Sequence, residues 1–260
     1  MIELHQVAAA VYLAAGIGAL LAIVLSAPRM GRGAVWGLGL GATFQLLAIA
    51  LGHGEMPLDN LAGALAIMSW MSVVFLLILM WRLRLPGLAA VVGPVAFLTV
   101  FIASLHAPEG AVVAERAGGP WPHAHVLLAS AGLALLGLAG VAGLFYILEF
   151  RRIKAKRPLV AGIRLPSLEA LDRVNMVALS IGFPLLSLGL VTGIFWLQEV
   201  QGRLWSGSHH ETWTAIAWAV YAALVTARFA GHQGARQAAA SAVGGFAFLI
   251  FAVVGVGVLT

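Results

Sequence analysis

The sequence predicts an all-α, polytopic integral membrane protein with eight transmembrane helices and both termini on the outer side. Of its 260 residues, 62% are hydrophobic and only 10% are charged, a balance too apolar for a soluble domain of this length. The apolar residues gather in eight stretches that approach the roughly 20 residues needed to cross a bilayer. Irregular backbone does not face lipid, so we expect each stretch to be helical.

The eight expected spans follow one another along a chain that we treat as a single membrane domain, residues 1–260. They cover residues 5–26, 34–53, 61–81, 87–105, 123–148, 176–198, 211–229 and 239–259. Pro94 and Pro184 fall inside the fourth and sixth spans and are expected to kink them. Before the sixth span, Leu168, Leu171 and Val174 recur at helical spacing, which predicts an amphipathic surface helix leading into it.

The basic residues predict the orientation of the chain. Most of them fall in alternate connections and therefore share one side of the membrane: Arg29, Arg32, Arg82, Arg84, the basic residues from Arg151 to Arg173, Arg228 and Arg236. The positive-inside rule makes this side cytoplasmic and places both termini outside, as expected for a bacterial cytoplasmic membrane. The net charge of +5 thus reflects topology, and nucleic acid is not an expected partner.

Several classes of chemistry are disfavoured by what the sequence lacks. It contains no cysteine, so the chain itself cannot run thiol–disulfide exchange or attach haem through a C-x-x-C-H motif. Glu199 and Glu211 have no nucleophile beside them, which argues against hydrolysis. The spans lack internal charges, which argues against an ion path. The N-terminal MIELHQ carries no basic segment, so the first apolar run is expected to be a retained span.

The histidines favour the outer side. Seven of the eight map to the outer face or to the outer ends of spans: His5, His53, His106, His123, His125, His209 and His210. Histidine is a common ligand of haem iron. It is also a common interfacial residue without a chemical role, and that is the simpler interpretation for any single one of them.

The outer end of spans six and seven combines histidines with tryptophans in the stretch WSGSHHETWTAIAW, residues 205–218. Ser208 and Glu211 have the spacing of a capping box, which predicts a helix start. Four indoles bracket this end: Trp196, Trp205, Trp213 and Trp218. They fit an interfacial aromatic belt and also a stacking platform for a flat, apolar porphyrin.

Residues 193–222 resemble the tryptophan-rich WWD segment of the cytochrome c assembly proteins, the CcsA, CcmC and HemX group. The matching positions are Gly193, Trp196, Gly202, Trp205, Glu211, Thr212, Trp213, Ile216, Trp218, Tyr221 and Ala222. Residues 56–70 resemble a second family stretch through Pro57, Leu58, Asn60, Leu61 and Trp70. The segment from His125 resembles the span that opens with the first external haem histidine of the family.

The resemblance implies a haem-handling membrane protein of cytochrome c biogenesis that presents haem b at the outer face to apocytochrome c. It implies that His125 is an axial ligand of the haem iron and that Trp196, Trp205, Trp213 and Trp218 form the haem platform. The implied partners are other cytochrome c maturation proteins, apocytochrome c and the lipid bilayer. The protein would be a haem chaperone or transporter component rather than an enzyme in the strict sense.

The sequence departs from the family where a second ligand is expected. The position of the external histidine after span eight falls near Leu259, and the span-seven histidine of CcsA-type members falls on Thr226. His210 or His209 are candidates for the second axial ligand, as are His53 and His5. The alternative is a HemX-like regulatory or interaction protein that has lost full haem ligation and binds its partner through the inner basic connection.

Overall fold

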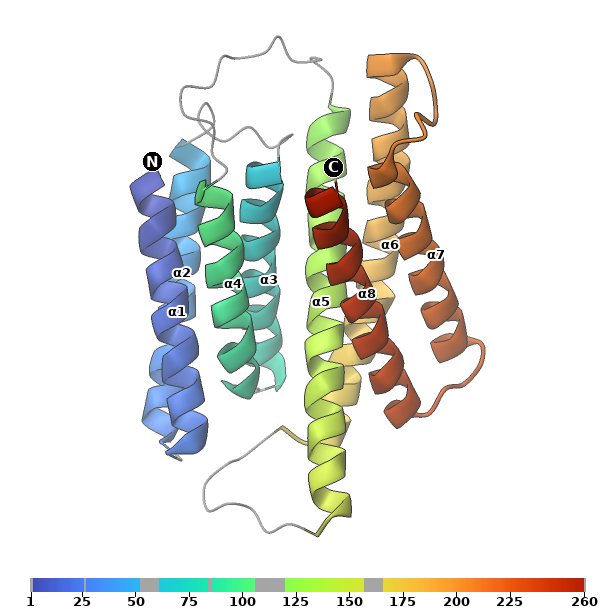
Figure 1. The fold of residues 1–260 in the computed structure, drawn as a ribbon. Helices are drawn as coiled ribbons and strands as arrows, with labels where there is room; N and C mark the ends of the chain where they lie inside the picture. Colours follow the sequence, from blue (N-terminus) through green and yellow to red (C-terminus); the bar gives the residue numbers. More distant parts are fainter. Residues whose placement is uncertain are drawn as a thin grey trace. The chain divides into compact units, whose positions relative to one another are not determined.

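The computed structural model describes residues 2–25, 27–51, 61–83, 86–105, 120–156 and 166–259, which are helical apart from short turns (Figure 1). They contain eight α-helices and one 3-10 turn. The chain divides into two compact units, one of residues 1–114 with 151–170 and the other of residues 115–150 with 171–260. His53 and His106 lie outside the described residues.

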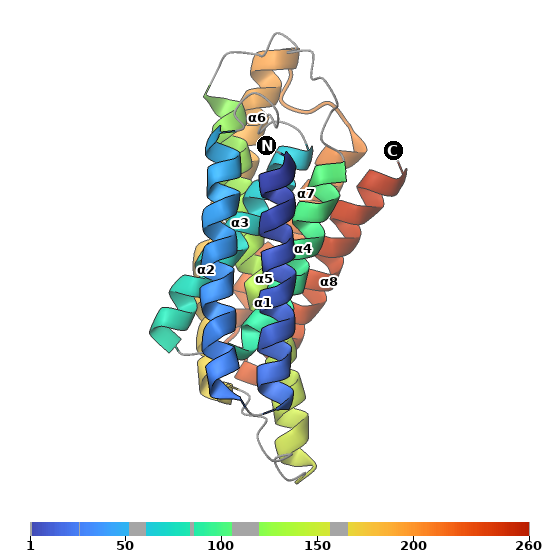
Figure 2. The same cartoon turned by 90° about the vertical axis from the view of Figure 1, so that its left-hand side faces the viewer.

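The first unit is a ring of four helices, α1 (Ile2–Val24), α2 (Pro28–Leu51), α3 (Leu61–Leu83) and α4 (Ala89–Leu105), with the 3-10 turn Pro86–Leu88 before α4. Each helix packs against the next one, and α1 closes the ring against α4 (Figure 2). Gly16 permits this closure, since a methyl group there would lie 2.3 Å from Cδ of Pro94. Small residues let membrane helices approach closely.

A buried polar chain crosses the first unit. The Tyr12 hydroxyl donates to Gln45 Oε1 at 2.7 Å, and Gln45 Nε2 donates to the Ala66 carbonyl at 2.8 Å. Tyr12 and Gln45 are fully buried. Because a buried polar group without a partner is costly, this chain of bonds fixes the register of α1, α2 and α3.

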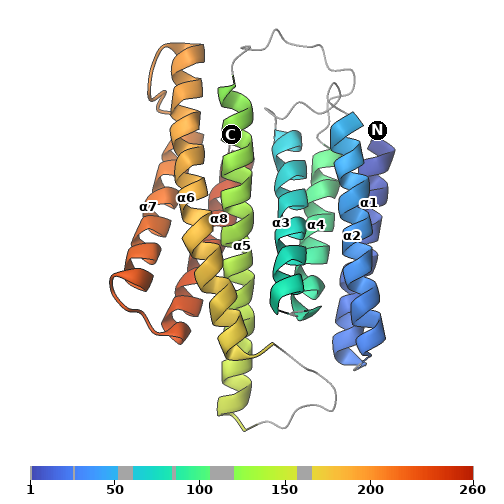
Figure 3. The ribbon, with the colours of Figure 1, turned by 180° about the vertical axis from the view of Figure 1, so that it is seen from behind.

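The second unit contains α5 (Trp121–Lys154) up to residue 150, α6 (Leu168–Gln201) from residue 171, α7 (His209–Phe229) and α8 (Ala235–Leu259), seen from behind in Figure 3. Glycines set its closest approaches: a methyl group at Gly132 would lie 2.6 Å from the Leu186 backbone nitrogen, and one at Gly143 2.6 Å from the Ala239 carbonyl oxygen. The apolar core is built from all four helices: Leu136, Ala139, Ala178, Leu179, Leu186, Tyr221 and Leu249.

The course of these helices brings three of their ends together. Helices α5, α6 and α7 alternate in direction, so the start of α5, the end of α6 and the start of α7 meet at one end of the unit (Figure 1). At the opposite end, Arg228 of α7 forms an ion pair with Asp172 of α6 at 2.8 Å. The end where α5 begins, α6 ends and α7 begins carries the predicted site residues, among them His125, Trp196 and His209.

The predicted all-α membrane class is confirmed, with one change in detail. Within the described residues, six helices are long and apolar enough to cross a membrane, namely α1, α2, α3, α5, α6 and α8, and α4 is a shorter apolar helix there. The count of eight spans, the side of the termini and the single domain stay predictions. The expected surface helix before span six is the start of the continuous α6, because Leu171 and Val174 are fully buried on the same stripe as Ala178.

Candidate functional site

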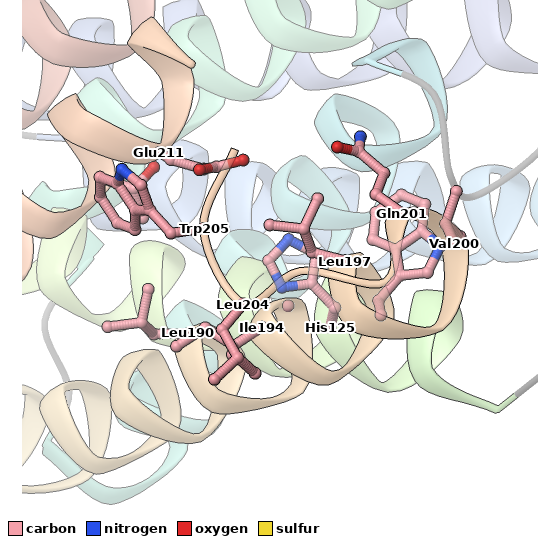
Figure 4. A pocket seen from close by; sticks show the side chains of 12 residues that line it. His125, Leu190, Ile194, Leu197, Val200, Gln201, Leu204, Trp205 and Glu211 are labelled. Atoms are coloured by element: carbon pink, nitrogen blue, oxygen red, sulfur yellow. The ribbon is translucent and has the colours of Figure 1, made fainter. Parts of the chain in front are cut away.

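A cavity of about 230 Å³ opens at the end of the second unit where α5 begins and α6 ends. Its walls come from α5, α6, the loop after α6 and the first turns of α7. Figure 4 shows the His125 ring in this cavity among Ile194, Leu197 and Leu204, with Trp205 and Glu211 farther along the wall. The lining is mostly apolar, with one imidazole and few other polar groups, as is common for sites that bind flat organic cofactors.

His125 is fixed by the backbone of the neighbouring helix. Its Nδ1 lies 2.7 Å from the carbonyl oxygen of Gly189 on α6. A carbonyl can only accept a hydrogen bond, so Nδ1 carries the hydrogen and donates it. In the neutral ring the lone pair then resides on Nε2. This is the usual arrangement of a metal-binding histidine, in which the second nitrogen is held by an outer partner.

Gly193 makes room for the ring one helical turn after Gly189. A methyl group at position 193 would lie 2.7 Å from His125 Nδ1 and 2.9 Å from its Cε1. A glycine at this position therefore lets the Nδ1–Cε1 edge of the imidazole approach α6. Gly193 matched the family pattern, but only the structure shows that its lack of a side chain leaves space for the His125 ring.

Two of the four predicted tryptophans line the cavity. Trp196 lies beside His125, with ring centroids 5.9 Å apart and planes inclined by 42°. Trp205 lies on the loop after α6, with 49% of its surface exposed. The structure thus brings His125, Trp196 and Trp205 to one cavity.

The other two tryptophans pack against neighbouring helices and are not among the cavity-lining residues. Trp218 donates from Nε1 to the Ser187 hydroxyl at 2.9 Å and stacks on Phe183, with ring centroids 5.9 Å apart. Trp213 contacts two phenylalanines of α8, Phe248 and Phe251. Their positions support the packing of α7, and a part in a haem platform stays a prediction.

Glu211 anchors the loop that carries Trp205. The Ser208 hydroxyl accepts from the Glu211 backbone nitrogen at 3.2 Å, which confirms the predicted helix cap. The Glu211 carboxylate reaches farther back than a capping box requires. It accepts from the backbone nitrogens of Ser206 and Gly207, at 2.7 and 3.2 Å, and from the Ser206 hydroxyl. One carboxylate thus holds the loop beside the cavity.

The predicted second ligands occupy different places. His209 is exposed at the first residue of α7, and His210 follows it, but its side chain lies outside the described part of the structure. His5 is buried in α1 of the first unit, where its Nδ1 has no hydrogen-bond partner among the described residues. The second axial ligand stays a prediction.

The sequence matches the model of a known protein family over most of its length. The family model for the cytochrome c assembly protein matches residues 58–260. The cytochrome c biogenesis protein CcsA of Prochlorococcus marinus strain MIT 9303 is 31% identical over 246 residues, which cover 84% of this chain and 77% of that protein. The chain belongs to the cytochrome c assembly protein family.

A more distant relative has the same name as the first. The cytochrome c biogenesis protein CcsA of Guillardia theta is 26% identical over 238 residues, which cover 81% of this chain and 79% of that protein. The resemblance read from the sequence is therefore confirmed at the level of the family. These relatives bear the name CcsA, and they do not favour the HemX alternative.

Membership of this family raises the question of whether the ligands and the volume of the cavity suit haem. The described residues contain no group of three or more His, Asp or Glu side chains that could hold a bare metal ion. Haem iron needs only axial ligands from the protein, and the tautomer of His125 suits that role. The cavity, at about 230 Å³, is smaller than the roughly 300–1,000 Å³ of common ligand pockets, so a whole haem macrocycle would extend beyond it. Val200 and Leu204, both more than half exposed at the rim, continue the apolar surface beyond it.

Sequence reasoning missed the groups that hold His125 in place. The acceptor is a main-chain carbonyl, that of Gly189, and no side-chain pattern reveals it. Thr214 of α7 and Gln201 of α6 also line the cavity without any signal in the sequence. The helical spacing of residues 189, 193 and 196 on one face of α6 could have indicated which side of the helix faces His125.

Proposed function

We propose that this cytochrome c assembly protein binds haem b at the cavity beside His125 and holds it for delivery to apocytochrome c, in a bacterial cytoplasmic membrane. Family membership supports a role in cytochrome c biogenesis. The observation that carries the haem site is the bond from His125 Nδ1 to the Gly189 carbonyl, at 2.7 Å. This bond leaves the lone pair of the neutral ring on Nε2, which would be the coordinating atom in an apolar, tryptophan-lined cavity.

The residues divide the work of binding. His125 would be one axial ligand, and Trp196 and Trp205 would contact the porphyrin face or edge, to which aromatic rings are suited. His209 and His210, at the start of α7, are the candidates for the second axial ligand. Two nitrogen ligands would leave the iron no open position, which would restrain oxygen chemistry before transfer. Trp213 and Trp218 would act by holding α7 in place.

When bound, haem would supply the prosthetic group that apocytochrome c receives. The chain itself would orient the ligand and keep water from one side of it, because the cavity walls are mostly leucine, isoleucine, valine and tryptophan. It has no cysteine, so any thioether bond must use the thiols of apocytochrome c. Other maturation proteins are therefore expected partners.

The test is an absorption spectrum of the purified protein after expression with ample haem, read together with the variant His125→Ala. We expect a Soret band in the unchanged protein and a shift or loss of that band in the variant. The matched control is His123→Ala, because His123 lies two residues away on α5 and is exposed, and its spectrum should be unchanged. A protein without a Soret band, or a band indifferent to His125→Ala, would refute the proposal.

A further inference from the structure

The Gly189 carbonyl receives hydrogen bonds from two side chains. His125 Nδ1 lies 2.7 Å from it, and the Thr192 hydroxyl lies 2.9 Å from it. The hydroxyl has one hydrogen, which it shares between the Gly189 oxygen and the Leu188 carbonyl oxygen, also 2.9 Å away. Thr192 is partly buried on α6, three residues beyond the carbonyl that anchors the predicted haem ligand.

The two donors act on the same acceptor. A carbonyl oxygen offers two lone pairs, and in a regular α-helix the backbone N–H four residues on is also directed at it. A hydroxyl that donates to this oxygen draws electron density from it and lowers its strength as an acceptor. The bond from His125 is therefore weaker than it would be without the Thr192 hydroxyl.

We propose that Thr192 is a positioning residue that sets the strength of the bond between His125 and the Gly189 carbonyl, and through it the electron donation of His125 to haem iron. This inference rests on the proposed function. An outer partner that pulls on the second nitrogen of a metal-bound histidine raises the basicity of the ligand. Thr192 moderates this pull, which suits a protein that must hold haem and later release it.

The direct test compares Thr192→Val with Thr192→Ser in the full-length, haem-loaded protein. Valine keeps the branched shape and removes the hydroxyl, and serine keeps the hydroxyl. In Thr192→Val we expect a stronger His125 bond, which favours ferric over ferrous haem by about threefold and lowers the midpoint potential by about 30 mV. The iron–histidine stretching frequency of the ferrous protein should rise. Thr192→Ser should match the unchanged protein.

The control for the loss of a helical threonine hydroxyl is Thr226→Val. Thr226 lies on α7, and its hydroxyl bonds only to its own helix, at the Ala222 carbonyl, among the bonds described. The potential of this variant should not move. A potential and a stretching frequency that are equal in Thr192→Val and the unchanged protein would overturn the inference.

A second measurement works without haem and separates the inference from the proposed function. In the haem-free protein, the Nδ1–H proton resonance of His125 should move downfield in Thr192→Val, because its hydrogen bond strengthens, and should stay in place in Thr192→Ser. A haem band that depends on His125, combined with an unmoved resonance and potential, would refute the role of Thr192 alone. A protein that binds no haem but shows the shifted resonance would refute the proposed function and the effect on haem iron, and would leave the effect of Thr192 on the His125 bond standing.

Discussion

Gly193 of α6 and His125 of α5 touch so closely that no side chain fits between them. A methyl group at position 193 would lie 2.7 Å from His125 Nδ1, well inside normal contact. The ring cannot retreat without losing its bond to the Gly189 carbonyl, which is 2.7 Å long. The position of the predicted haem ligand therefore depends on a residue that has no functional group.

Gly193→Ala should displace His125 and weaken haem binding. Overpacking of this kind costs about 1–3 kcal/mol, and we expect a weaker or shifted Soret band. The measurement is haem titration followed by absorption. Gly244→Ala is the matched control, because a methyl group at Gly244 of α8 meets nothing within 4 Å. Equal haem affinity in the two variants would contradict the prediction.

Glu211→Gln should loosen the loop that carries Trp205. A glutamine side chain has one acceptor oxygen in place of the carboxylate that takes bonds from Ser206 and Gly207, and bonds to a charged group contribute about 1.5–3 kcal/mol. We expect faster protease cleavage between residues 202 and 208. Glu199→Gln is the control, because Glu199 is exposed near the end of α6. Cleavage at the same rate in both variants would count against the anchoring role.

Trp218→Phe should lower stability and leave the haem spectrum in place. The variant loses the 2.9 Å bond to Ser187, which is expected to contribute about 1 kcal/mol. Trp196→Phe should instead change the spectrum, since Trp196 lines the cavity beside His125. Thermal unfolding and absorption of both variants decide the matter. A shifted Soret band in Trp218→Phe would restore Trp218 to the haem platform.

Tyr12→Phe should destabilise the first unit. It removes the donor to Gln45 Oε1 in a fully buried position, and a buried acceptor left without a partner costs about 1–3 kcal/mol. The midpoint of thermal unfolding should fall. Thr43→Val on α2 is the control, because its hydroxyl bonds only to the Gly39 carbonyl of its own helix, among the bonds described, and is exposed. A midpoint that falls equally in both variants would argue against the importance of the buried chain.

The helices were predictable because each membrane helix is a long run of apolar residues, which can be recognised in the sequence alone. Runs of apolar residues predicted each helix to within a few residues where they were long, as at α3, whose observed bounds are Leu61–Leu83. The polar first turns of α6, predicted as an amphipathic surface helix leading into span six, are helical and continuous with that span despite their change in polarity. The buried stripe through Leu171 and Val174 shows that packing continued across that change.

The site was predictable only in part, because the sequence shows the types of the side chains but not their arrangement in space. His125, Trp196 and Trp205 were identified by type and resemblance, and they share the cavity. Nothing in the spacing of the tryptophans separated these two from Trp213 and Trp218, since which face of α7 packs inward depends on the tertiary contacts with α6 and α8. The reach of the Glu211 carboxylate to Ser206 depends on the loop conformation and could not be predicted either.

The anchor of His125 has an evolutionary consequence. Its acceptor belongs to the peptide backbone, so no exchange of one amino acid for another can delete it. With His125 kept, the bond is broken by added bulk that displaces the ring or pushes α5 and α6 apart, and at Gly189 even a methyl group would collide with the Ala129 main chain at 2.8 Å. Natural selection for the position of His125 would therefore keep the residues small where α5 packs against α6. A survey that considers only functional side chains would overlook this constraint.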